Sequence, residues 1–351
     1  MKNNKRMETN LTAAQDEAAK AGKSLEVGDV EKAIQHYHKA QKLAPSDADI
    51  ICNLGIAYFR NQEFGLAEES FKKALSLDNT LTEANFNLGL LFQEKEEWES
   101  ALSFYKEAFL NNKKDLAILL RMGECAGHAN REDDAYAFWE EAVKHHPDDL
   151  EAVSLFAGLL IEREEYEKAE DVLRMGLVSN NKEVSLYFTL GLVLNEQNKM
   201  NKALAQFKKV IDIDPQHALA YYNLAACCEV LNFDKQAEPF YAKAYKLNPD
   251  FPDPVFQLAE LYVRRNMKKK AVTMYEKFVA MVEESGEQIH PEYRKQFIRA
   301  CEYLSGWFKG HGDNVQAQNY ADKKDAAPED PDPQARESGE DDYRVSLQIE
   351  E

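Results

Sequence analysis

Side chains able to form paired hydrogen bonds recur at intervals of 34 residues along this sequence. An amide group donates and accepts hydrogen bonds at once, so it can bind a peptide bond whatever side chain follows. Thr189 also belongs to the series, and Leu155 interrupts it in the middle of the chain. The chemistry that these residue types could perform is hydrogen bonding to a peptide backbone. The members of the series with an amide or a guanidinium group are Asn53, Asn87, Arg121, Asn223 and Gln257.

Sequence motifs of enzymes are missing. There is no glycine-rich phosphate loop, no His-Glu-x-x-His, no Gly-x-Ser-x-Gly and no pair of metal ligands at helical spacing. His145 and His146 precede a proline at a predicted helix end, which is typical of surface histidines. The cysteines form no Cys-x-x-Cys pair, which predicts reduced and partly buried thiols. We therefore expect no catalytic residue, no metal site and no cofactor.

The charge of the chain excludes several partners. Its formal net charge is -19, and residues 322–351 contribute 11 acidic against 4 basic residues. This negative charge repels phosphate groups, and no stripe of basic residues offsets it. We therefore expect no binding to nucleic acid. No stretch approaches the roughly 18 apolar residues of a membrane-spanning helix, and residues 7–17 lack the apolar core of a signal peptide. A cytoplasmic location is the expectation.

The elements that position these side chains are marked by alanines spaced 34 residues apart. A second column, at the eighth position of each repeat, holds only alanine or glycine, as expected where two helices cross closely. Large apolar residues surround both columns in two blocks of helical i, i+3, i+4 spacing, so each repeat is predicted to be a helical hairpin. The first column is Ala33, Ala67, Ala101, Ala135, Ala169, Ala203, Ala237 and Ala271; the second is Ala21, Gly55, Gly89, Gly123, Ala157, Gly191, Ala225 and Ala259.

The turn inside each hairpin also has a signature. Several repeats place glycine or asparagine between the two blocks, and these residues tolerate the left-handed conformation that ends a helix. Prolines stop the second helix because they cannot donate the next backbone hydrogen bond. The turn residues are Gly28, Asn130, Asn198, Asn232 and Asn266, and the prolines are Pro45, Pro147, Pro215 and Pro249.

This pattern resembles the tetratricopeptide repeat (TPR) family, whose signature is matched by Ile51, Leu54, Gly55, Tyr58, Ala67, Phe71 and Ala74. The resemblance implies an all-α fold, a right-handed superhelix (α-solenoid) of helical hairpins. It covers residues 14–285 as eight tandem repeats, after a short N-terminal segment at residues 1–13. The predicted repeats are 14–47, 48–81, 82–115, 116–149, 150–183, 184–217, 218–251 and 252–285.

The resemblance also implies a binding site. In similar solenoids the first helix of each repeat lines a concave groove, and part of the apolar lining can instead serve packing between repeats. The repeat region is similar to the superhelical TPR region of O-linked N-acetylglucosamine transferases, in which asparagines hold the backbone of extended peptides; no transferase domain follows here. The predicted groove residues are Asn53, Ile56, Phe59, Phe86, Asn87, Leu90, Leu120, Arg121, Phe188, Leu192, Tyr222, Asn223, Phe256, Gln257 and Glu260.

A second mechanism of the family fits poorly. The carboxylate clamp of TPR co-chaperones needs lysines, an arginine and two asparagines, and only Asn87 and Arg121 match. Acidic residues share the inner columns, so we expect a protein or peptide partner that combines apolar residues with Lys or Arg. These acids are Glu83, Glu94, Glu124, Glu151, Glu162, Glu196, Glu229, Asp253 and Glu260.

The region after the repeats divides in two. Apolar residues from Tyr293 to Phe308 recur at helical spacing, so residues 286–310 are predicted to form a capping helix on the last repeat, with a partner-binding helix as the alternative. Residues 311–351 are acidic and poor in apolar residues, which predicts a disordered tail. Near its end, Tyr343 to Ile349 alternates apolar and polar residues, a pattern that could dock on a partner or be an unselected terminus.

Together these features favour a non-enzymatic scaffold or adaptor that binds a peptide segment of a partner in its groove and supports assembly of a complex. The first alternative is a structural protein that self-associates through its repeats or its capping helix. The second alternative is a regulatory subunit of a separate enzyme, with the tail as a removable occupant of the groove.

Overall fold

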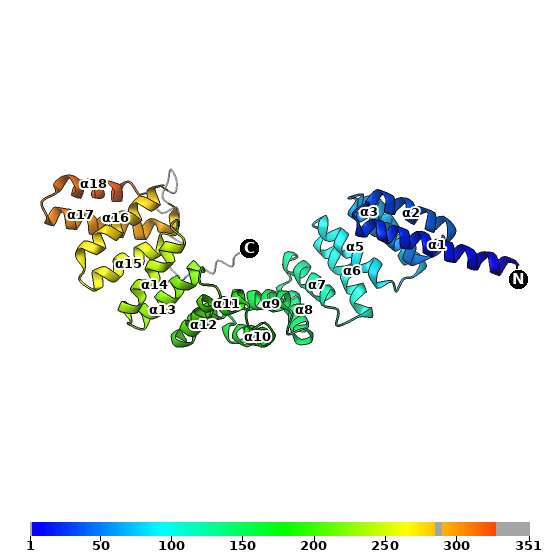
Figure 1. Ribbon diagram of the computed structural model, residues 1–351, viewed down its shortest axis with the longest axis horizontal. Coiled ribbons are helices and arrows are strands. Elements are labelled where there is room, and N and C mark those ends of the chain that lie inside the picture. The colour runs from blue at the N-terminus through cyan, green and yellow to red at the C-terminus, as the bar shows by residue number, and fades with distance from the viewer. Residues whose placement is uncertain (1, 285–289, 328–351) are drawn as a thin grey trace. The chain divides into compact units, whose positions relative to one another are not determined.

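The computed structural model describes residues 2–284 and 290–327, and within them it contains α-helices and one short 3-10 helix but no strand. The predicted all-α fold class is confirmed. Helices follow one another in antiparallel pairs along the chain (Figure 1). The first helices of the pairs are α1 (Lys2–Glu26), α3 (Ala48–Arg60), α5 (Thr82–Glu94), α7 (Leu116–His128), α9 (Leu150–Glu162), α11 (Val184–Glu196), α13 (Ala218–Val230) and α15 (Asp253–Arg264). The second helices are α2 (Val30–Leu43), α4 (Phe64–Leu77), α6 (Trp98–Asn111), α8 (Glu132–His145), α10 (Tyr166–Ser179), α12 (Met200–Ile213), α14 (Asp234–Leu247) and α16 (Lys268–Glu284).

The chain divides into two compact units, residues 1–159 and residues 160–351, called unit 1 and unit 2 below. The boundary falls inside α9. Within each unit, helices pack on their hairpin partners and on the neighbouring hairpin, and buried apolar clusters extend across several hairpins. This is the arrangement expected of repeats that each bury their apolar face on a neighbour.

The columns read from the sequence occupy the centre of each hairpin. All eight alanines of the first column are fully buried. The glycines of the second column lie against an aromatic ring of the same hairpin: a Cβ atom built on Gly55 would lie 2.7 Å from Phe71 Cε1, and one on Gly89 would lie 2.5 Å from Tyr105 Cε1. The absence of a side chain at these positions lets the ring fill the crossing.

The turns repeat with the same spacing. One residue with positive φ lies between the helices of each pair, including Gly28 at φ 79° and Asn130 at φ 56°. Three turns instead use Gln62, Glu96 and Glu164, at φ values of 58° to 61°. The left-handed conformation costs such residues roughly 1 kcal/mol each, so helix packing determines the turn there.

The region after α16 differs from the expectation of a disordered tail starting at residue 311. A 3-10 helix (Pro291–Tyr293) leads into α17 (Arg294–Gly310), and a further helix, α18 (Asn314–Asp325), packs against α17. The Ser305 hydroxyl donates to the Ala317 carbonyl oxygen at 2.8 Å, and the Phe308 and Tyr320 rings stack with centroids 5.8 Å apart. Residue 285 of the last predicted repeat, residues 286–289 of the predicted capping helix and residues 328–351 of the predicted tail lie outside the described residues.

The α17–α18 pair keeps the internal spacing of the earlier hairpins. Its turn residue, Gly312, has φ 81°. It lies 46 residues after Asn266, the turn residue of the preceding hairpin, which is 12 residues more than the repeat length of 34. Ser305 and Ala317 fall at the small-residue positions in this shifted register. The pair is therefore a further hairpin of the same kind, displaced along the sequence by a longer connection.

Candidate peptide-binding face

Six of the predicted groove residues gather on two neighbouring helices of unit 1, α3 and α5, which contact each other. All six side chains are half-buried, so each presents part of its surface to a ligand. The Phe86 ring packs on the Tyr105 ring at a centroid distance of 5.5 Å, and the Phe59 ring packs on Phe64 at the same distance. This α3–α5 face consists of Asn53, Ile56, Phe59, Phe86, Asn87 and Leu90.

The two asparagines of the α3–α5 face retain hydrogen-bonding capacity. The Asn87 side-chain nitrogen donates to the Glu83 carbonyl oxygen at 2.7 Å, one turn earlier on α5, which leaves its side-chain oxygen free to accept. The Asn53 amide has no hydrogen-bond partner among the described residues. Since the amides lie one repeat apart on adjacent helices, both can engage the backbone of one extended peptide.

Acidic side chains surround the same face. Asp49 lies on α3, and Glu83 and Glu94 lie on α5; all three are exposed. None forms an ion pair within residues 2–284 and 290–327. Their charges are therefore available to attract a cationic partner.

The next helix, α7, contributes less than predicted. The Leu120 side chain is only 6% exposed, which assigns it to packing between hairpins. Arg121 is half-buried and its guanidinium group donates to Glu124 at 2.7 Å, so its charge is neutralised. Glu124 also accepts from the Gln93 amide at 3.3 Å.

In unit 2 the predicted residues are mostly covered. Phe188 and Tyr222 are half-buried, and their rings contact Phe207 and Tyr241 of the paired helices. The other predicted groove residues on α11 and α13 are Leu192 and Asn223, and both are buried. The Asn223 side-chain nitrogen donates to the Leu219 carbonyl oxygen of the same helix at 2.9 Å.

The structure removes three predicted groove residues from the accessible surface. Phe256, Gln257 and Glu260 on α15 are each about 5% to 6% exposed. Arg299 on α17 binds both carboxylate oxygens of Glu260, from Nε at 2.6 Å and from Nη2 at 2.5 Å, and the Tyr275 hydroxyl also donates to this carboxylate. Glu260 is covered because α17 packs on the last repeat, whereas the Phe256 ring packs on Tyr275 and Phe278 of α16.

Comparison with known proteins identifies the repeats. Models of the "TPR repeat" family match residues 25–62 and 191–227, and models of the "Tetratricopeptide repeat" family match residues 48–81, 128–190 and 255–282. Together they cover more than half of the chain. It is a TPR protein.

Curated relatives of this TPR protein are longer than it is. Protein O-mannosyl-transferase TMTC1 of Homo sapiens is 28% identical over 202 residues, which are 56% of this chain and 23% of that protein. TPR repeat-containing protein MJ1428 of Methanocaldococcus jannaschii is 24% identical over 279 residues, 74% of this chain and 48% of that protein. The TPR protein thus spans less than half the length of each.

A solved structure shows the same fold. The C-terminal part of a TPR repeat-containing protein from Cytophaga hutchinsonii aligns with a TM-score of 0.57 at 15% identity, and the alignment covers 68% of this TPR protein and 93% of that chain.

The described part of the TPR protein lacks the features of a metal site and of a membrane-spanning helix. No group of three or more His, Cys, Asp or Glu side chains there could hold a metal ion, and no helix there is long and apolar enough to cross a bilayer. The five cysteines are free and buried. Burial raises the pKa of Cys52, Cys125, Cys227 and Cys301 to about 12, so these thiols are protonated and unreactive at neutral pH.

Another of the predicted acids, Asp253, lies at the start of α15 and accepts a hydrogen bond from the Tyr293 hydroxyl at 3.1 Å. Burial, together with the nearby charge of Glu292, outweighs this hydrogen bond and raises the pKa of Asp253 to about 6. A raised carboxyl pKa means that the folded state holds the proton more tightly than the unfolded state. The free energy of unfolding therefore falls as the pH rises from the ordinary carboxyl pKa of 3.8 to about 6, and it stays lowered above pH 6, where Asp253 is ionised in both states.

Replacing Asp253 with asparagine is expected to remove this pH dependence. Asn keeps a carbonyl oxygen for the Tyr293 hydroxyl but carries no charge. We expect the variant to exceed the wild type in free energy of unfolding at pH 7.5, and this advantage to shrink by roughly 1 kcal/mol on going to pH 5. Urea unfolding of both proteins at the two pH values measures it; parallel pH profiles would contradict the assignment.

Proposed function

We propose that this TPR protein is a non-enzymatic scaffold or adaptor that binds an extended segment of a partner protein on the α3–α5 face. The observation that carries the proposal is the unpartnered Asn53 amide, placed one repeat from Asn87 and beside half-buried apolar side chains. Amides of this kind bind a peptide backbone, and apolar side chains between them contribute affinity through burial.

The charge around the α3–α5 face supports the chemistry of the partner. Asp49, Glu83 and Glu94 are exposed and lack cationic partners in the described structure, so the face attracts Lys or Arg. In unit 2 two of the predicted inner acids, at other positions of the repeat, are compensated, because Glu229 pairs with Arg264 at 2.7 Å and Glu260 pairs with Arg299. The preference for a segment that combines apolar and basic residues therefore belongs to unit 1.

The compartment is part of the proposal. Five free, buried thiols need no oxidising environment and fit the reducing conditions of the cytoplasm.

A random peptide library selected on the immobilised full-length protein tests this function. We expect the enriched peptides to combine apolar residues with Lys or Arg, and the double variant Asn53→Ala, Asn87→Ala to bind them about tenfold more weakly, since two amide contacts are lost. Fluorescence anisotropy with a labelled peptide measures the affinity.

The matched control carries the same number of amide deletions elsewhere. Asn181 and Asn201 are exposed and lie outside the predicted peptide-contact positions, so the variant Asn181→Ala, Asn201→Ala should bind like the wild type. Equal affinity of both double variants, with unchanged helicity, would show that the α3–α5 amides do not bind the peptide.

A further inference from the structure

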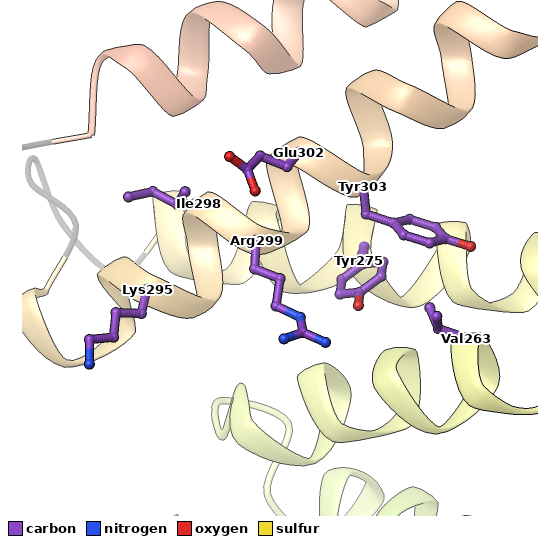
Figure 2. Close-up of a pocket in the computed structure, with 7 residues that line it drawn as sticks. All are labelled: Val263, Tyr275, Lys295, Ile298, Arg299, Glu302 and Tyr303. Carbon is purple, nitrogen blue, oxygen red and sulfur yellow. The ribbon is translucent and has the colours of Figure 1, made fainter. Parts of the chain in front are cut away.

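An open pocket lies in unit 2, on helices that do not contribute to the proposed α3–α5 face. It has a volume of about 650 Å³ and is lined by α15, α16 and α17. Figure 2 shows Arg299 and Tyr303 extending from α17 toward Tyr275 and Val263, with Lys295 one turn before Arg299. In the shifted register of the α17–α18 hairpin, Arg299 and Tyr303 take the second and sixth positions of the repeat, which are inner positions in TPR solenoids. The unshifted 34-residue register does not place them there, because the longer connection after α16 displaces this hairpin.

The pocket combines an apolar and aromatic lining with cationic groups. The apolar and aromatic part of the lining consists of Val263, Ile298, Tyr275 and Tyr303. Lys295 is exposed and forms no ion pair with the described residues.

Arg299 adds a second cation to the pocket. Its side chain is 64% exposed although Nε and Nη2 bind Glu260, so Nη1 remains available. The one acid in the lining, Glu302, is offset by Lys324 at 3.8 Å. A ligand that carries carboxylates together with aromatic or aliphatic side chains fits this chemistry.

The chain itself carries such a segment. Residues 328–351 contain nine acidic and two basic residues, including the run Glu340, Asp341 and Asp342, followed at once by Tyr343 and then by alternating apolar residues to Ile349. Residues 1–251 repel it with 42 acidic against 29 basic residues, whereas residues 252–327 have 11 acidic against 12 basic. Charge therefore directs the segment to the C-terminal hairpins.

The connection makes this contact easy to form. The segment starts two residues after α18 ends, and α18 packs on α17, which lines the pocket. A chain of 24 residues can span up to roughly 80 Å, so the pocket is within its reach. A tether of this kind gives an effective concentration in the millimolar range, at which a weak contact is occupied.

We propose that the C-terminal segment, residues 328–351, binds in cis to the pocket of α15, α16 and α17. Its acidic run contacts Lys295 and Arg299, and the apolar residues from Tyr343 onward contact the aromatic lining. The pocket is separate from the α3–α5 face, so this contact does not depend on the proposed function.

Trypsin cleavage after Arg344 in the intact full-length protein tests the contact. The protection factor is the cleavage rate of a free synthetic peptide of residues 328–351 divided by the cleavage rate of the same segment in the protein. Because cleavage follows the population of the released segment, we expect the wild type to be protected about tenfold. The variant Lys295→Glu, or 0.5 M salt, should reduce the protection several-fold.

The control is Lys246→Glu on α14, an exposed residue outside the pocket at which the same charge change should leave the protection unaltered. A wild-type protection factor near one would overturn the proposal, as would equal protection in the Lys295→Glu variant. Protection that rises with protein concentration would place the segment on a second copy and would also overturn binding in cis.

Discussion

Replacing Gly89 with leucine will destabilise unit 1 by about 3 kcal/mol or more, the largest effect we expect from a single substitution. A Cβ atom at this position would lie 2.5 Å from the Tyr105 ring, and that ring is fully buried. The ring has no room to move, because its hydroxyl donates to Gln93 at 2.9 Å and Phe86 packs on it. Overpacking of a rigid core side chain costs 1 to 3 kcal/mol, and four added carbons place this case at or beyond the upper end.

Urea unfolding followed by circular dichroism measures the loss, and hydrogen exchange locates it in α5 and α6. Gly65 on α4 provides the control, since it is exposed and a Cβ atom there would meet nothing within 4 Å. Gly65→Leu should therefore match or slightly exceed the wild type, because leucine has the higher helix propensity. Equal midpoints for the two variants would show that close crossing at the glycine column does not hold the hairpin together.

Replacing Arg299 with alanine will destabilise unit 2 by about 3 kcal/mol. Glu260 is buried, and its carboxylate depends on two hydrogen bonds from Arg299 as well as on Tyr275. Removing one partner of a buried ion pair leaves the other charge uncompensated, which costs 3 to 5 kcal/mol. Arg299→Lys should recover only part of this, because lysine cannot bind both oxygens in the same way.

Denaturant unfolding with hydrogen exchange of α15 to α18 measures this effect. The double variant Glu260→Gln, Arg299→Ala should be more stable than Arg299→Ala alone, since the buried charge is removed as well. Lys309→Ala on the same helix, at an exposed position, serves as the control and should stay within about 0.5 kcal/mol of the wild type. A loss below about 1 kcal/mol for Arg299→Ala would mean that Glu260 is adequately solvated without it.

The fold was predictable because its determinants are local and periodic. The alanine and glycine columns report close helix crossings directly, since a larger side chain at Gly89 would collide with Tyr105. The turns at Glu96 and Glu164 could not be predicted from residue type, because packing forces an ordinary residue into the left-handed region there. Helix α18 was not predicted, because the composition of residues 311–351 as a whole is acidic and poor in apolar residues. Burial of two side chains, Ala317 and Tyr320, against α17 is sufficient to stabilise this helix.

The candidate site was predictable only in part. Column positions indicate which side of a helix a residue takes, but they do not show what covers that side. The column residues Asn53 and Asn87 are accessible, whereas Gln257 in the corresponding part of the last repeat is buried and Glu260 is paired with Arg299 of α17. The pairing of Glu260 with Arg299 joins residues 39 positions apart, outside the 34-residue register, so periodicity alone could not reveal it.

Site-directed photo-crosslinking tests binding at the α3–α5 face most directly. A benzophenone amino acid at Leu90, inside the face, is compared with the same probe at the exposed Leu66 on α4, in the full-length protein mixed with a peptide from the library selection. Our account predicts that irradiation links the peptide at Leu90 and not at Leu66, and that unlabelled peptide competes. Crosslinking at Leu66 alone, or at neither position with a peptide that binds, would contradict it.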